Sequence, residues 1–109
     1  MMLPSNPQSR GTPTYDLERI QQLVGQGLVS YRVTAAARYG AAELGLSEDE
    51  LVEIVLSLTP SHFYKSMESE QLPGLWQDVY HFPHGAAVLY VKLQIDPLGR
   101  AVIIQCKEK

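Results

Sequence analysis

Four side chains able to act on a phosphate group are spread over the second half of this chain. They are Lys65, Gln77, Tyr90 and Lys107. Lysines stabilise phosphate charge, a tyrosine can relay a proton or stack on a base, and a glutamine can orient a phosphate oxygen. Together they suit chemistry at a phosphodiester if they meet on one surface. The alternative interpretation, which such loose spacing favours, is that they are solvated surface residues.

β-strands are the elements that must position these residues, because the apolar pattern after Pro60 has a period of two. In the clearest run, 88–95, Leu89, Val91 and Leu93 alternate with polar residues. Successive strand side chains point to opposite faces, so all four candidates can point away from the apolar face under one condition. The condition is that four further residues share their side: Phe63, Val79, Lys92 and Gln105.

Turn signals join the strands into an antiparallel meander. Asp96-Pro97-Leu98-Gly99 fits a type I turn, and Pro83-His84-Gly85 suggests another reversal before Val88. The strand 101–107 should therefore fold back on 88–95, after earlier strands at 63–67 and 76–80. These patterns predict about four strands in a mainly antiparallel sheet.

The first half of the chain predicts three helices. Residues 17–24 carry apolar side chains at helical spacing, Thr34 is a plausible N-cap for the alanine-rich run 35–44, and Ser47 with Glu50 forms a capping box that starts a third helix. Residues 28–33 alternate loosely and could form a short edge strand. We expect an α+β fold in which the three N-terminal helices pack on one face of the sheet.

Composition indicates a single globular domain over 14–109, preceded by a disordered tail over 1–13 that is rich in proline. No apolar run approaches the ~20 residues of a membrane span. A lone cysteine and the lack of a signal-like segment favour the cytoplasm. The net charge is −3, yet residues 61–109 hold five basic and five acidic side chains, which leaves room for a local basic patch.

Metal chemistry has only a weak signal. There is no phosphate-cradling glycine loop, nucleophile elbow or paired zinc knuckle. His81, His84 and Cys106 could supply three ligands, so a metal-dependent nuclease stays an alternative that excess chelator would test. We expect no metal and no cofactor, with His62 at the surface and Cys106 as a small buried hydrophobe.

Four sequence blocks, in this order and spacing, resemble the MqsR (motility quorum-sensing regulator) toxins of type II toxin-antitoxin systems. The similarity spans residues 17–109, and the blocks are Phe63-Tyr64-Lys65-Ser66-Met67, Trp76-Gln77-Asp78-Val79-Tyr80, Tyr90-Val91-Lys92 and Lys107-Glu108-Lys109. The resemblance implies a RelE-like fold and a ribosome-independent, metal-free mRNA interferase. Such an enzyme cuts single-stranded RNA, with a preference for GCU-type sites.

The family's catalytic residues correspond to Lys65, Gln77 and Tyr90, with Lys107 matching a further site lysine. Three candidate substrate-binding residues are added: Lys92, His81 and Gln105. Lys92 and Gln105 fall on the same strand face by alternation, and His81 stands just after the Trp-Gln-Asp-Val-Tyr block, where such toxins can carry arginine.

The resemblance also implies a protein partner, a zinc-carrying, DNA-binding antitoxin of the MqsA type. Contact with DNA would then be indirect, through the antitoxin, and no membrane is involved. A competing hypothesis is a non-catalytic family member that acts as a regulatory binding module for that antitoxin. Toxicity that depends on Lys65 and Tyr90 would favour the enzyme.

Overall fold

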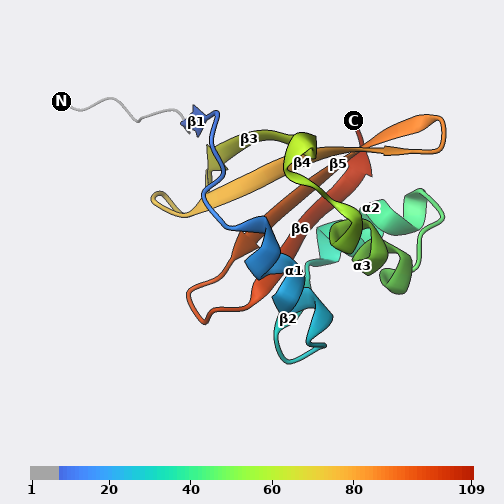
Figure 1. Ribbon diagram of the computed structural model, residues 1–109, viewed down its shortest axis with the longest axis horizontal. Helices are drawn as coiled ribbons and strands as arrows, with labels where there is room; N and C mark the ends of the chain where they lie inside the picture. Colours follow the sequence, from blue (N-terminus) through green and yellow to red (C-terminus); the bar gives the residue numbers. More distant parts are fainter. Residues whose placement is uncertain (1–7) are drawn as a thin grey trace.

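The computed structural model describes residues 8–109, which build a twisted six-stranded sheet with three helices (Figure 1). The strands lie side by side in the order β1-β3-β4-β5-β6-β2. All neighbours are antiparallel except β2 and β6, which are parallel. The strand bounds are β1 Ser9–Arg10, β2 Tyr31–Val33, β3 Phe63–Glu68, β4 Trp76–His84, β5 Ala87–Ile95 and β6 Ala101–Glu108.

The helices begin at side chains that accept hydrogen bonds from their first turns. Asp16 caps α1 (Leu17–Gly25), and Thr34 caps α2 (Ala35–Glu43). Ser47 and Glu50 form the predicted capping box of α3 (Glu48–Ser57), and a short 3₁₀ turn, η1 (Pro60–His62), leads into β3. In the part of the chain that is described, no helix is long and apolar enough to cross a membrane.

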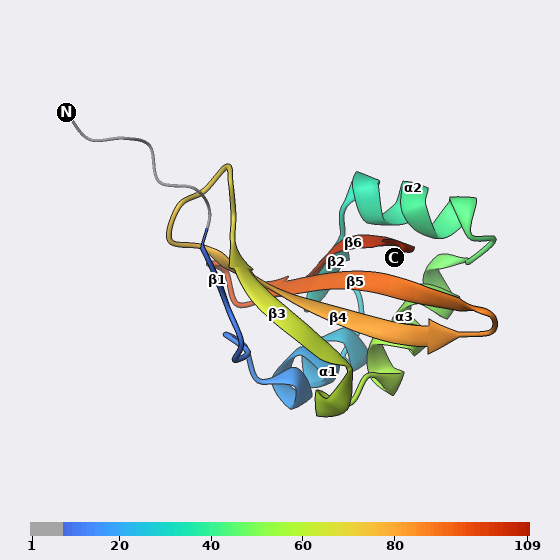
Figure 2. The same cartoon turned by 90° about the horizontal axis from the view of Figure 1, so that it is seen from above.

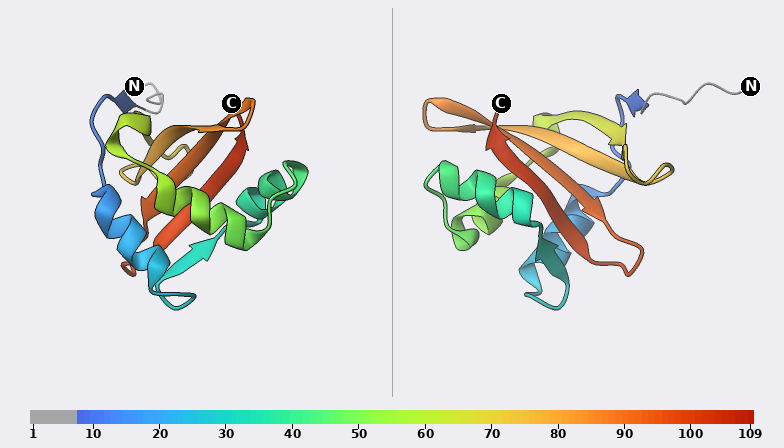
Figure 3. Two further views of the ribbon diagram at one scale, coloured as in Figure 1. Left: turned by 45° about the vertical axis from the view of Figure 1, so that its right-hand side comes forward. Right: turned by 180° about the vertical axis from the view of Figure 1, so that it is seen from behind.

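One face of the sheet carries the hydrophobic core. Helices α1 and α3 lie over this face, with α2 alongside β6 (Figures 2 and 3). The apolar side of α1 packs against α3, and both meet the inward side chains of β5 and β6. The core includes Ile20, Leu51, Leu89, Val91 and Ile103, each fully buried.

The predicted α+β class and the three helices are confirmed, but the strand count is wrong. The sheet has six strands rather than about four, and β1 and β2 are interspersed with the helices. Both strands are too short to give a clear alternating pattern. Their places in the sheet depend on pairing with β3 and β6, which are distant in the sequence. The expected packing of all three helices on one face also differs in detail, because α2 lies alongside β6 (Figure 2). The possible edge strand in 28–33 is confirmed as β2, and Gly99 N–H donates to the Asp96 carbonyl (2.9 Å) in the expected turn.

The expected loose tail over 1–13 lies partly outside the described residues. Within the described part, Ser9 and Arg10 pair with β3 as a short strand. The Arg10 guanidinium also lies 3.8 Å from the centre of the Trp76 ring. Cation–π contact and strand pairing therefore order this polar segment, which has little apolar surface of its own.

Buried Asp78 ties the segment before α1 to the sheet. Its carboxylate accepts hydrogen bonds from the backbone N–H groups of Thr14 (3.0 Å) and Tyr15 (2.9 Å). The Tyr15 hydroxyl donates to the carbonyl of Trp76 (2.7 Å), and the hydroxyls of Thr14 and Ser66 bond to each other (2.6 Å). A buried carboxylate is tolerated here because backbone donors satisfy it.

Close backbone packing joins α2 to β6. A Cβ atom built on Gly40 would overlap the backbone carbonyl oxygen of Cys106. The small side chains of Ala37 and Ala41 are buried beside it, so the helix lies directly against the strand. Glycine at position 40 is therefore a packing requirement, although glycine weakens a helix interior.

Gly40→Ala should destabilise the protein by about 1–3 kcal/mol, because the methyl group forces α2 away from β6. The matched control is Gly25→Ala, at the end of α1, where a Cβ meets no atom within 4 Å. That variant should be neutral or more stable by up to about 1 kcal/mol. Urea denaturation followed by circular dichroism measures both. Equal effects would contradict the packing argument.

Asp78→Ala should lower the free energy of unfolding by about 2–4 kcal/mol, since two backbone N–H groups lose their acceptor in a buried place. Asp78→Asn, which keeps one acceptor oxygen, should cost less. The control is Glu53→Ala at an exposed position on α3, expected within about 0.5 kcal/mol of wild type. Chemical denaturation compares the three, and an Asp78→Ala protein as stable as the control would refute this role.

Candidate active site on the open face of the sheet

The sheet face opposite the helices brings together all seven residues that the sequence analysis selected. Two cross-strand rows build it: one pairs Lys65, Val79, Lys92 and Gln105, and the next pairs His81, Tyr90 and Lys107. Gln77 lies two residues before Val79, opposite Met67. Paired residues share a face, so these side chains form one surface, which we call the open face.

A β-bulge in β3 corrects one part of the prediction. Phe63 was expected on the open face, but it pairs with Tyr80 and packs against the core. Pairing then jumps to Lys65 opposite Val79, so Tyr64 is the extra residue. A bulge changes the alternation locally, which puts Phe63 on the helix side while Lys65 stays on the open face.

Tyr90 stands at the centre of the open face. Its hydroxyl donates a weak hydrogen bond to the sulfur of Met67 (3.8 Å). The Lys107 ammonium is 5.0 Å from the centre of its ring, and that of Lys92 is 5.8 Å away. Burial, and next the charge of Tyr64, raise the pKa of Tyr90 above its ordinary value of 10.0. Its hydroxyl therefore keeps its proton at neutral pH and is a proton donor.

The lysines give this face a positive charge that the net charge of −3 does not reveal. Burial is the main cause that lowers the pKa of Lys92, and Lys107 and Lys65 lower it further, while Glu70 opposes them. Like charges that lower each other's pKa in this way favour an anion nearby, because a phosphate would reduce their mutual repulsion.

A groove of about 420 Å³ lies on the Lys92 side of the open face, and Lys92 is the one of these three lysines that lines it. The β3–β4 loop forms one wall and the start of α2 another, and the residues that line it include Met67, Gln77, Lys92, Gln105 and Glu70. Its size suits a nucleotide base or phosphate. Two larger grooves, of about 570 and 600 Å³, lie against α3 and α1 and include none of the seven predicted residues.

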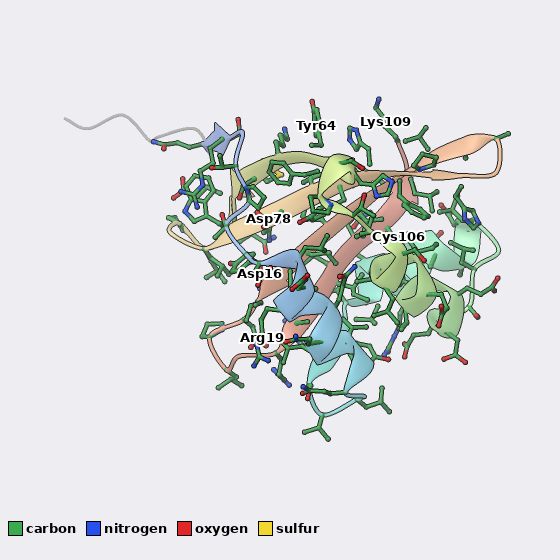
Figure 4. All side chains as sticks on the ribbon, viewed as in Figure 1. Asp16, Arg19, Tyr64, Asp78, Cys106 and Lys109 are labelled. Atoms are coloured by element: carbon green, nitrogen blue, oxygen red, sulfur yellow. The ribbon has the colours of Figure 1, made fainter. Side chains whose placement is uncertain are left out.

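The sequence analysis missed that Tyr64 stacks on His81. The rings of Tyr64 and His81 stack with their centres 4.1 Å apart and their planes 20° apart. Tyr64 is 53% exposed and, with Lys109, points away from the helices (Figure 4). The only hint in the sequence was an aromatic residue next to Lys65. The bulge, which alternation cannot reveal, allows Tyr64 to reach the stack.

The three possible metal ligands do not converge. Cys106 is buried on the helix side, paired with Val91, whereas His81 lies on the open face and His84 is exposed near the end of the β4–β5 hairpin. Burial also raises the pKa of Cys106 to about 11, so this residue is the small buried hydrophobe that was expected. Within residues 8–109, no three His, Cys, Asp or Glu side chains gather as metal ligands do.

Comparison with known proteins identifies the family of this chain. The family described as "Motility quorum-sensing regulator, toxin of MqsA" matches residues 12–108. The mRNA interferase toxin MqsR of Escherichia coli (strain K12) is 35% identical over 98 residues, which cover 90% of this chain and 96% of that protein. The family match includes all four strands of the open face, β3 to β6. The chain therefore belongs to the MqsR toxin family.

Proposed function

We propose that this protein is the toxin of a type II toxin-antitoxin system and acts as an mRNA interferase, an endoribonuclease for single-stranded RNA. The observation that carries the proposal is the meeting of Lys65, Lys92, Lys107 and Tyr90 on one open face in a member of this family. The proposal includes action without the ribosome or a metal ion, a preference for GCU-type sites, and a cytoplasmic location.

The reaction is a transesterification at phosphorus. The ribose 2′-oxygen attacks the neighbouring phosphorus, its proton leaves, and the bond from phosphorus to the 5′-oxygen breaks. The products are a 2′,3′-cyclic phosphate and a 5′-hydroxyl, with the leaving oxygen taking up one proton. An enzyme must therefore accept a proton, stabilise the charge on the phosphorane and donate a proton.

The open face supplies groups for the last two tasks. Lys65 and Lys107 approach from β3 and β6, the strands on either side of β4 and β5, and stabilise the phosphorane charge. Tyr90, between them, donates or relays a proton to the leaving oxygen, since its hydroxyl makes only a weak bond to Met67. Gln77 orients a phosphate oxygen from the groove wall. Lys92, His81 and Gln105 contact the RNA substrate.

The proposed protein partner is an antitoxin of the MqsA type, through which any contact with DNA would be indirect. The family description names this protein's relatives as toxins of MqsA. An alternative is a family member without catalytic activity that serves as a regulatory binding module for the antitoxin. The two hypotheses differ in whether toxicity to the cell depends on the lysines and Tyr90 of the open face.

Purified protein should cut a defined single-stranded RNA at GCU sites in the presence of excess chelator. Tyr90→Phe and Lys65→Ala should each reduce the cleavage rate by about 100-fold or more, because each removes a group that acts on the transition state. Product ends analysed by mass spectrometry should carry cyclic phosphate. The matched controls, Tyr39→Phe and Arg19→Ala, alter exposed side chains on helices and should cut normally.

Cleavage that chelator abolishes would overturn the metal-free mechanism. No cleavage by folded wild type across a pool of single-stranded RNAs would overturn the enzyme proposal and favour the binding module.

Expression of the wild-type protein in bacteria should arrest growth. Lys65→Ala and Tyr90→Phe should each abolish the arrest, because it depends on RNA cleavage. Co-expression of the antitoxin should restore growth. Growth curves and immunoblots at matched protein levels measure the effect. Equal arrest by wild type and both variants would contradict a catalytic toxin.

A further inference from the structure

His81 occupies a central place on the open face. It lies in the middle of β4, opposite Tyr90, which in turn lies opposite Lys107. The rings of His81 and Tyr90 are 6.2 Å apart between centres and tilted by 42°, and the ring of Tyr64 stacks on the histidine with the centres 4.1 Å apart. Stacking on Tyr64 fixes the plane of the imidazole, and the cross-strand pairing sets this ring next to Tyr90.

The charges around His81 favour its neutral form. Burial is the largest cause that lowers the pKa of His81 below its ordinary value of 6.5, and Lys109 and then Lys65 lower it further. Across residues 8–109, no ion pair joins this histidine to a carboxylate. The titratable groups that face it from β3, β5 and the end of β6 are Tyr64, Lys65, Tyr90, Lys92, Lys107 and Lys109.

This setting meets the one catalytic requirement that the other site residues leave open. Cleavage needs a group that accepts the proton of the 2′-hydroxyl. Tyr90 keeps its own proton, and Gln77 does not titrate in this range. A neutral imidazole is the side chain best suited to accept a proton near pH 7.

We propose that His81 is the general base of the cleavage reaction. A ring nitrogen of His81 takes the proton of the 2′-hydroxyl as the 2′-oxygen bonds to phosphorus. The bond from phosphorus to the 5′-oxygen breaks, and that oxygen takes a proton from Tyr90. The imidazolium then releases its proton to solvent, and Tyr90 regains one, so no proton is gained or lost overall. This inference rests on the proposed ribonuclease function.

The competing explanation is that His81 only supports the ring of Tyr64 or stacks on a base. His81→Phe separates the two, because phenylalanine keeps an aromatic ring for stacking but cannot accept a proton. His81→Gly opens space in which free imidazole can replace the missing side chain. The matched control is His84→Gln, which changes an exposed histidine three residues further along the same strand.

The experiment measures kcat/KM for cleavage of the single-stranded RNA between about pH 5 and 8. Wild-type activity should fall as the pH drops through the pKa of His81, because the protonated ring cannot accept a proton. His81→Phe should lose about 100-fold or more in activity at neutral pH and should also lose this acid limb. Added imidazole should restore activity to His81→Gly, and His84→Gln should match wild type.

Two results would overturn the inference while leaving the ribonuclease proposal intact. They are a His81→Phe protein with wild-type activity and an unchanged acid limb, and a His81→Gly protein, folded by circular dichroism, that imidazole does not rescue. Failure of the wild type to cut RNA would overturn the ribonuclease proposal, and the general-base assignment with it.

Discussion

The antiparallel register of β3 to β6 is the constraint on which this molecule depends. Each residue of the open face is paired across strands with another, and the residues between them are in the core. A slip of one residue would bury Lys92 and expose Leu93. The hydrophobic core therefore also aligns the site: the burial of Leu89, Val91 and Leu93 fixes which way the polar side chains of β5 point.

Backbone contacts outside the site support this register. Gly40 lets α2 lie against the backbone of Cys106, directly between the site residues Gln105 and Lys107 on β6. On β4, Asp78 holds the segment before α1 from a position next to Gln77. Cys106 and Asp78 are each adjacent in sequence to a site residue, and their own side chains point to the helix side of the sheet. Packing on the helix side thus limits movement on the open face.

Charge is separated between the two sides. The first turn of α3 holds Glu48, Asp49 and Glu50, where negative charge favours the helix dipole, while lysines gather on the open face. An acidic protein can in this way present a positive surface to RNA. Partial burial strengthens the effect, because water screens the charge of Lys92 less than that of an exposed lysine. Net charge alone is consequently a poor guide to what such a surface binds.

Local signals in the sequence determined the helices, the turns and the alternation that set Lys65, Gln77, Tyr90 and Lys107 apart from the core. Such signals suffice because capping, turn geometry and strand periodicity depend on residues close together in the chain. Only the tertiary structure decided the pairing of β1 and β2, the bulge that turns Phe63 inward, and the stacking of Tyr64 on His81. These features arise from contacts between distant segments, which leave no periodic trace in the sequence.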